Sequence, residues 1–214
     1  MLGSLNIELW DIINIATGTI DWIIFFSVIQ LVGKRKISGV KYIFRIMIIF
    51  IFMGFINAAK VFPNIKIILC IVIGTSFYII SYKDKIYISI IVSLLFWLGL
   101  MLAEGLAVGL VVLLNQLNNI NITQNENLFR IQAIILSKVF LFIGLIIFKY
   151  FKLSLDFKPK DIVLIGLPIL SNIVSLILIY EYNLRANSIK IGNLFIFVFA
   201  IVLIVSSSII LLIV

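Results

Sequence analysis

The stretch from Ile86 to Asn115, IYISIIVSLLFWLGLMLAEGLAVGLVVLLN, decides the fold. Glu104 is its only charged residue, and the stretch exceeds the roughly 20 residues that a helix needs to cross a bilayer. Further apolar stretches lie on both sides of it: Ile7–Val32, Tyr42–Asn57, Ile65–Tyr82, Leu128–Phe151, Asp161–Tyr182 and Leu194–Val214. The sequence therefore predicts an all-α, polytopic membrane helix bundle with seven transmembrane helices.

The overall composition excludes a soluble protein. Hydrophobic residues make up 64% of the 214 residues and charged residues 12%, and the mean hydropathy is +1.29. A soluble domain of this size could not bury that much apolar surface. We expect residues 1–214 to form a single transmembrane domain in the plasma membrane, in contact with membrane lipid.

The Lys and Arg residues gather at alternate connections between the apolar stretches. The connections rich in Lys and Arg are the first, with Lys34, Arg35, Lys36, Lys41 and Arg45, the third, with Lys83 and Lys85, and the fifth, with Lys149, Lys152, Lys158 and Lys160. The other connections carry only Lys60 and Lys66, Arg130, and Arg185 with Lys190. Basic loops stay in the cytoplasm, so the pattern predicts an outside N-terminus and a cytoplasmic C-terminus. The net charge of +8 thus reflects topology, and no nucleic acid partner is expected.

The chain lacks the residues of common catalytic and metal sites. It contains no His, which removes Ser-His-Asp and Cys-His catalysis and a phospho-accepting His. Its one cysteine, Cys70, is expected to be a small buried residue. There is no glycine-rich phosphate loop. We therefore expect no catalytic residue, no metal and no cofactor in this chain.

The outer connections are too short to form a ligand-binding domain of their own. The longest, Gln116–Asn127, has about a dozen residues, far below the roughly 40 that a domain core needs. An external signal must then be read by the bundle itself. Trp10 and Asp11, together with Glu181 and Tyr182, would give the outer mouth both apolar surface and acidic groups, which suits a small amphipathic peptide. An aromatic belt at the membrane interface would explain the rings equally well.

Charged side chains lie deep in three of the apolar stretches. Glu104 is about eleven residues below the outer end of the fourth, and Lys138 about ten below the outer start of the fifth. Because the two reach similar depth, we predict that they pair, with Asp21 as an alternative or additional partner of Lys138. Such a pair could fix helix register only, or could take part in switching.

Small residues and one proline mark the packing of two helices. Gly99, Ala103 and Ala107 form one row in the fourth stretch, and Gly105 and Gly109 form a second, so we predict close helix packing. The neighbour could be another helix of this chain or a second subunit. In the sixth stretch Pro168 predicts a kink, with Ser171, Asn172 and Ser175 available to satisfy the freed backbone groups.

Three short segments support a family resemblance: Leu9-Trp10-Asp11-Ile12-Ile13, Gly33-Lys34-Arg35-Lys36 and Phe157-Lys158-Pro159-Lys160-Asp161. With the order of seven crossings, they make the chain resemble the membrane sensor region of AgrC-like sensor histidine kinases of the GHKL type. The likeness covers the whole chain and rests on the order of the predicted helices and on the general character of the sequence.

The resemblance implies a quorum-sensing receptor of Gram-positive bacteria. Such a receptor binds a secreted, usually cyclic, autoinducing peptide outside and signals through its last helix to a kinase, which acts on a response regulator. The family works as a homodimer. The kinase segments are missing here, so we expect a sensor domain whose native chain continues past Val214 into a kinase region, since the sequence stops within an apolar run.

Two other classes of membrane protein have a similar size. A peptide-processing endopeptidase of the same systems depends on His and Cys, and the absence of His excludes it. The substrate-binding membrane component of a small-molecule transporter remains the alternative.

Overall fold

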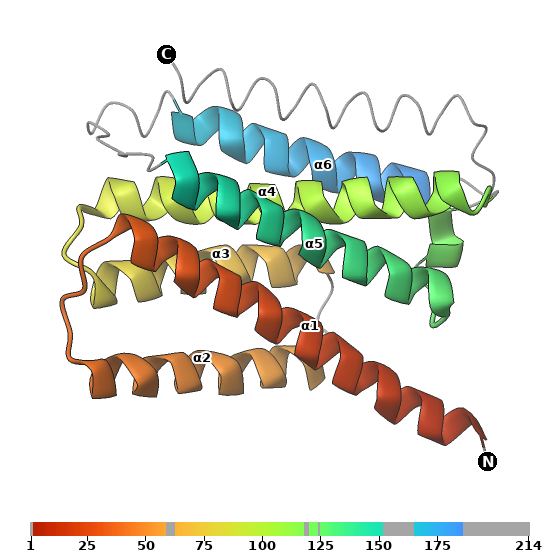
Figure 1. The fold of residues 1–214 in the computed structure, drawn as a ribbon, viewed down its shortest axis with the longest axis horizontal. Coiled ribbons are helices and arrows are strands. Elements are labelled where there is room, and N and C mark those ends of the chain that lie inside the picture. The colour runs from red at the N-terminus through yellow and green to blue at the C-terminus, as the bar shows by residue number, and fades with distance from the viewer. Residues whose placement is uncertain (1, 59–62, 118–119, 124, 152–164, 186–214) are drawn as a thin grey trace. The chain divides into compact units, whose positions relative to one another are not determined.

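The computed structural model describes residues 2–58, 63–117, 120–123, 125–151 and 165–185. The regular secondary structure within these ranges is helical, and they contain no β-strand. Its elements are α1 (Leu2–Val32), α2 (Gly39–Ala58), α3 (Pro63–Ser81), α4 (Ile86–Leu114), the short 3₁₀ helix η1 (Ile120–Thr123), α5 (Leu128–Phe151) and α6 (Leu167–Arg185) (Figure 1). The all-α prediction is confirmed for these ranges, while the seventh predicted crossing, Leu194–Val214, lies outside them.

Four of these helices are long and apolar enough to cross a membrane. The candidate spans are Leu9–Val32, Gly39–Ile56, Ile86–Leu114 and Leu128–Tyr150. In α3 and α6 the apolar stretches are shorter, Ile65–Ser81 and Pro168–Ile177. The span in α4 is 61% buried, whereas the other three are 22–33% buried. A helix that is apolar on all sides is expected at the interior of a bundle, and α4 fits that description.

The described residues fall into two compact units. Unit 1 contains α1, α2, α3, the part of α4 up to Ser93, and the end of α5 from Phe148. Within it α1 packs on α2, and α2 packs on α3. Its core holds a chain of aromatic rings: Trp22 contacts Phe26 at a centroid distance of 5.7 Å, Phe26 contacts Phe77 at 4.9 Å, and Phe77 contacts Tyr42 at 5.5 Å. Trp22 is 1% exposed, so this row of aromatic rings begins deep in the unit.

Unit 2 contains the rest of α4, then η1, α5 up to Ile147, and α6. Its best-defined core joins α4 to α5, because Val108, Val111 and Val112 form one buried cluster with Ala133. The partly buried side chains of Leu117, Phe129 and Leu136 pack against this cluster. The connection between α4 and α5 also belongs to this unit, and its helix η1 contacts α6.

Candidate functional site

The four residues predicted for the outer mouth come from both units. Trp10 is 6% exposed and has interaction partners in the structure, whereas Asp11 beside it is exposed. Trp10 therefore packs inside the protein instead of lying open at an interface. Glu181 and Tyr182 belong to the last turns of α6, where only the backbone is described. A mouth built from all four residues stays a prediction.

Two of the three intramembrane charges are buried. Asp21 in α1 and Lys138 in α5 are each 7% exposed, while Glu104 in α4 is exposed. Each of the three has an interaction partner in the structure. Glu104 and Lys138 belong to the same unit, as their predicted pairing requires. The pairing itself stays a prediction.

A basic residue of α3 shares the surroundings of Asp21. Both Lys66 and Asp21 are within electrostatic range of the thiol of Cys70, which lies one turn beyond Lys66 in α3. Cys70 is 3% exposed, and its thiol donates to Met53 Sδ at 3.9 Å. The sequence pattern assigns Lys66 only to a connection on the predicted outer side. Its spacing of four residues from a buried cysteine was the signal that it also faces the interior.

The sequence pattern does not predict the burial of two serines in α4. Ser89 and Ser93 are one turn apart and fully buried, and their hydroxyls have no hydrogen-bond partner in the part of the chain that is described. Serine in an apolar helix usually bonds to its own backbone, as Ser27 does with the carbonyl of Ile23 at 2.9 Å. Ser89 and Ser93 thus present polar groups to the interior of unit 1.

The small residues of α4 differ in their surroundings. Ala103, Gly105, Ala107 and Gly109 are all buried within the chain, and Ala107 is 0% exposed. Gly99 is not at a close contact, because a Cβ built there would meet nothing within 4 Å. The tight packing predicted from this row therefore does not include Gly99. Ala103, Gly105, Ala107 and Gly109 are buried by other residues of the same chain, as expected if α4 packs against helices of its own chain.

The proline of the sixth stretch stands at a change of helix type. Ile165 and Gly166 form part of a wider π-helical turn, and the α-helical geometry of α6 begins at Leu167. Pro168 then occupies the first turn of α6, where the backbone N–H that proline lacks would have no acceptor within the helix. Asn172 has an interaction partner, while Ser171 is exposed.

The connection between α4 and α5 has a helix cap at each end. At the end of α4, Gln116 adopts a φ of 50°, and the N–H of Leu117 donates to the carbonyl of Val112 at 3.0 Å. This is a Schellman cap with glutamine in the left-handed position. At the start of α5, Asn127 Oδ1 accepts from the N–H of Arg130 at 3.0 Å. Asn127 Nδ2 also donates to the carbonyl of Ile122 at 2.6 Å, so one side chain joins the helix start to η1.

Asn127→Ala is expected to destabilise this connection by about 1 kcal/mol, because loss of an N-cap side chain costs about 0.5–2 kcal/mol. Asn127→Asp should keep the cap, since a carboxylate accepts from Arg130 and favours a helix N-terminus, but should lose the bond to Ile122. Hydrogen exchange of the Arg130 amide measures the cap. The control is Asn125→Ala at an exposed position of the same connection. Equal protection of Arg130 in the Asn127→Ala variant and in wild type would contradict the assignment.

Within unit 1, the connections α1–α2 and α3–α4 are joined by backbone hydrogen bonds. Arg35 pairs with Tyr82 in an antiparallel bridge. The N–H of Lys36 donates to the carbonyl of Ser81 at 2.9 Å, and the N–H of Lys83 donates to that of Lys34 at 3.0 Å. Together with the side-chain contacts described next, we call this arrangement the clasp.

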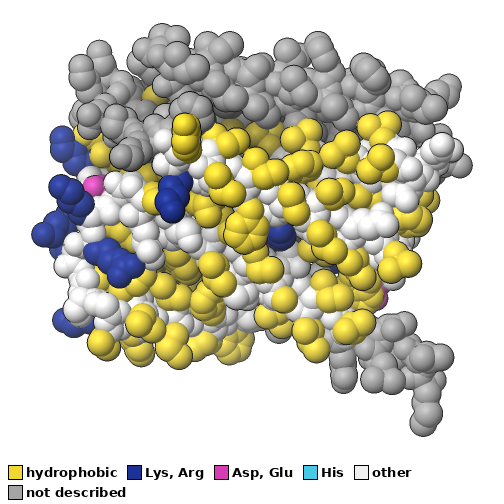
Figure 2. Space-filling model, viewed as in Figure 1, with side chains coloured by type: hydrophobic (Ala, Val, Ile, Leu, Met, Phe, Trp, Pro, Cys, Tyr) yellow, Lys and Arg dark blue, Asp and Glu magenta, His cyan; other side chains and the backbone are white. Residues whose placement is uncertain are grey.

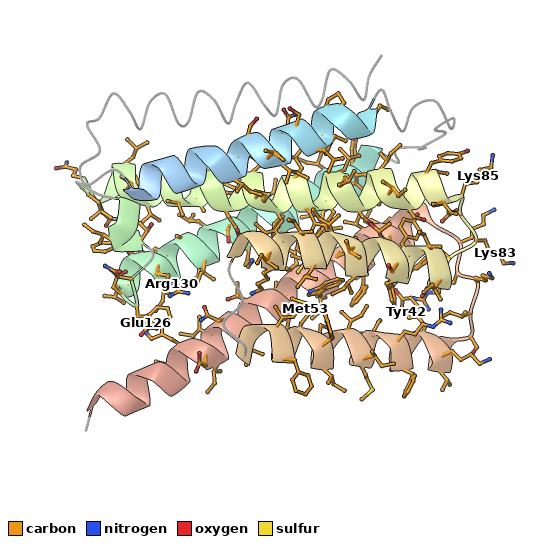
Figure 3. All side chains as sticks on the ribbon, turned by 180° about the vertical axis from the view of Figure 1, so that it is seen from behind. Tyr42, Met53, Lys83, Lys85, Glu126 and Arg130 are labelled. Carbon is orange, nitrogen blue, oxygen red and sulfur yellow. The ribbon has the colours of Figure 1, made fainter. Side chains whose placement is uncertain are left out.

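Side chains from three helices complete the clasp. The hydroxyls of Tyr42 and Tyr82 are 2.9 Å apart, and Gln30 Nε2 donates to the Tyr42 hydroxyl at 3.2 Å. The guanidinium carbon of Arg35 lies 4.3 Å from the centroid of the Tyr42 ring. Arg45 donates to the carbonyl of Ile80 at 2.9 Å. Figure 3 shows Tyr42 among these side chains, at the same end as Lys83 and Lys85. The clasp therefore ties the ends of α1, α2 and α3 together.

Gly33 lies at the tightest point of the clasp. A Cβ at this position would meet Asp84 Oδ2, Tyr82 Cδ1 at 2.7 Å and the Tyr78 hydroxyl at 2.9 Å. Tyr78 and Tyr82 are 0% and 2% exposed, so they have little room to withdraw. The sequence shows Gly33 only as the first residue of a basic turn, and its neighbours come from a distant connection.

Most of the described basic residues of unit 1 are concentrated at the clasp, and only Lys66 in α3 and Lys149 in α5 lie elsewhere. Those at the clasp are Lys34, Arg35, Lys36, Lys41, Arg45, Lys83 and Lys85, all of which except the half-buried Arg45 are exposed. Figure 2 shows Lys and Arg side chains gathered at one edge of the visible face. These residues are the ones that the sequence assigns to the cytoplasmic side.

Comparison of the chain with protein-family models, curated proteins and solved structures found no match. Functional inference therefore rests on the residues themselves.

Proposed function

We propose that this chain is a multi-pass membrane receptor domain of the quorum-sensing histidine kinase type, which binds a small secreted peptide at its outer side. The long apolar helices support membrane insertion. The concentration of cations at the clasp supports a cytoplasmic location for that end. The resemblance to AgrC-like sensor regions supports the class of ligand and implies a homodimer, with a response regulator reached through the parent kinase.

The burial of Asp21 and Lys138 carries this proposal. Both charges lie within helices that qualify as membrane spans, and both are 7% exposed. Insertion of such a charge costs roughly 2.5–3.5 kcal/mol, so ionisable residues within spans usually have a functional partner. Paired charges on helices of a bundle offer a switch that can take two arrangements.

Signalling in such a receptor requires that the ligand bind one arrangement of the helices more tightly than the other. A peptide at the outer ends of the helices would shift the balance between the two arrangements. In unit 1 the aromatic chain from Trp22 to Tyr42 runs from the neighbourhood of Asp21 to the clasp. Because the clasp ties three helix ends together, a displacement of α1 would reach the cytoplasmic side as a movement of the whole unit.

A photoreactive cyclic peptide applied to intact cells tests this function. We expect crosslinks at the outer ends of the helices or within Gln116–Asn127. Asp11→Asn should weaken peptide binding about tenfold, because one charge-assisted hydrogen bond contributes about 1.5–3 kcal/mol. Lys36→Gln changes a charge at the opposite end and should leave binding unchanged.

The same experiment distinguishes the transporter alternative. Purified protein in nanodiscs is titrated in parallel with the peptide and with vitamin-like metabolites. Tight binding of a metabolite without binding of any peptide would contradict the receptor function and favour a transporter component.

A further inference from the structure

A cavity of about 380 Å³ lies at the start of α2, at the basic end of unit 1. Val40, Lys41, Phe44 and Arg45 line it, and we call it the α2 groove. These positions are adjacent on one face of the helix, because residues three and four apart meet on a helical surface. The outer-mouth prediction includes none of these residues.

The two basic residues that line the α2 groove, Lys41 and Arg45, have no acid between them on this helix. Lys41 and Arg45 are one turn apart, a spacing at which like charges repel. Arg45 is held in place, since its guanidinium donates to the carbonyl of Ile80 at 2.9 Å and to Ser81 Oγ at 3.3 Å. Both bonds use one nitrogen of a group that carries five N–H donors. The pair therefore presents a positioned guanidinium and an exposed ammonium to an anion.

The surroundings of the α2 groove strengthen its positive potential. Lys34, Arg35 and Lys36 lie in the connection that precedes α2, and the only acid described in the clasp is Asp84. The N-terminus of α2 adds the positive end of a helix dipole. This charge favours an anionic ligand over a neutral or cationic one.

The walls of the α2 groove are hydrocarbon. Val40 is 80% exposed and Phe44 is 64% exposed. The same helix continues with exposed apolar side chains: Ile43, Met47, Ile48, Ile51, Phe52 and Phe55. From Val40 to Phe55 this face is roughly 22 Å long at 1.5 Å per residue, and it can cover an acyl chain over half of a bilayer core of about 30 Å. A free inorganic anion would gain no binding energy from contact with this apolar surface.

We propose that the α2 groove binds an anionic phospholipid, with the phosphate between Lys41 and Arg45 and one acyl chain along Val40 and Phe44. Basic clusters at the cytoplasmic end of membrane helices are known to favour anionic headgroups. The site is independent of the proposed peptide receptor function. It would fix the depth of α2 in the membrane through the same Arg45 that bonds to the clasp.

Native mass spectrometry of the purified full chain tests the site. Protein from nanodiscs that contain equal amounts of phosphatidylglycerol and phosphatidylcholine should retain phosphatidylglycerol. Lys41→Gln should lower this retention about fivefold, and Lys41→Gln with Arg45→Gln roughly 25-fold, from about 1 kcal/mol per cation near the surface. Lys41→Arg should restore it. The matched control, Lys83→Gln with Lys85→Gln, removes two exposed charges at the same end, outside the groove and outside the connection that precedes α2, and should retain the lipid.

Three outcomes would overturn the site. Equal retention of phosphatidylcholine would show general lipid contact, and an equal loss in the control variant would show dependence on total charge. Displacement of phosphatidylglycerol by millimolar inorganic phosphate would show a free-anion site. Because Arg45→Gln also removes bonds to Ile80 and Ser81, the single variant Lys41→Gln decides the result if the double variant does not fold.

Discussion

Gly33→Ala is expected to destabilise the protein by about 1–3 kcal/mol, the usual effect of overfilling a packed site. The added methyl group would collide with Asp84 Oδ2, Tyr82 Cδ1 and the Tyr78 hydroxyl. Two of these atoms are oxygens, and both tyrosine side chains are buried. The two connections would have to separate, which would break the bond from Lys36 to Ser81 and that from Lys83 to Lys34. Thermal unfolding in detergent should show a lower melting temperature for this variant.

Gly18→Ala is the matched control, because Gly18 lies in the interior of α1, the helix that ends just before Gly33, and a Cβ there meets nothing within 4 Å. This variant should be neutral or more stable by up to about 1 kcal/mol, since alanine favours a helix. Adding Asp84→Ala to Gly33→Ala should recover part of the loss. If Gly33→Ala and Gly18→Ala had the same melting temperature, the close packing at Gly33 would be wrong.

Hydropathy predicts each described α-helix of this chain, and it places the bounds of α4 and α5 to within one residue. The predicted Leu128–Phe151 is α5 as observed, and the predicted Ile86–Asn115 is longer than α4 by one residue. Charge and turn residues interrupt the apolar stretches sharply, so a count along the chain is enough. At α6 the α-helical geometry begins at Leu167, after the π-helical Ile165 and Gly166, and the first four residues of the predicted stretch Asp161–Tyr182 lie outside the described ranges.

The side-chain contacts could not be predicted in the same way. Hydropathy gives the depth of Glu104 but not its rotational position on a helix that is apolar on every side, and the structure exposes this residue. Lys66 reads as a connection residue, yet it acts on Cys70 inside unit 1 together with Asp21. The clasp joins connections about 45 residues apart in the sequence, and only tertiary packing brings them together.

A double-mutant cycle on Glu104 and Lys138 is expected to give the other large effect. If the two pair, Glu104→Gln leaves an uncompensated ammonium at a position that is 7% exposed, which costs about 3–5 kcal/mol. Lys138→Met leaves only the exposed Glu104 and should cost less. The double variant should recover a large part of the loss, because no unpaired charge remains. Thermal unfolding of the four proteins in nanodiscs gives the coupling free energy.

The same cycle separates the possible partners of the two buried charges. Asp21→Asn is combined in turn with Lys138→Met and with Lys66→Met, since Lys66 and Asp21 are both within electrostatic range of the Cys70 thiol. Coupling above about 1 kcal/mol identifies a pair, whereas additive effects exclude it. We expect the largest coupling for Glu104 with Lys138, and a second one for Asp21 with Lys66. If Glu104→Gln and Lys138→Met were additive and Asp21→Asn coupled to Lys138→Met, Asp21 would replace Glu104 as the partner of Lys138. The switch would then join α1 to α5, and Glu104 would be left as a polar group on the outside of α4.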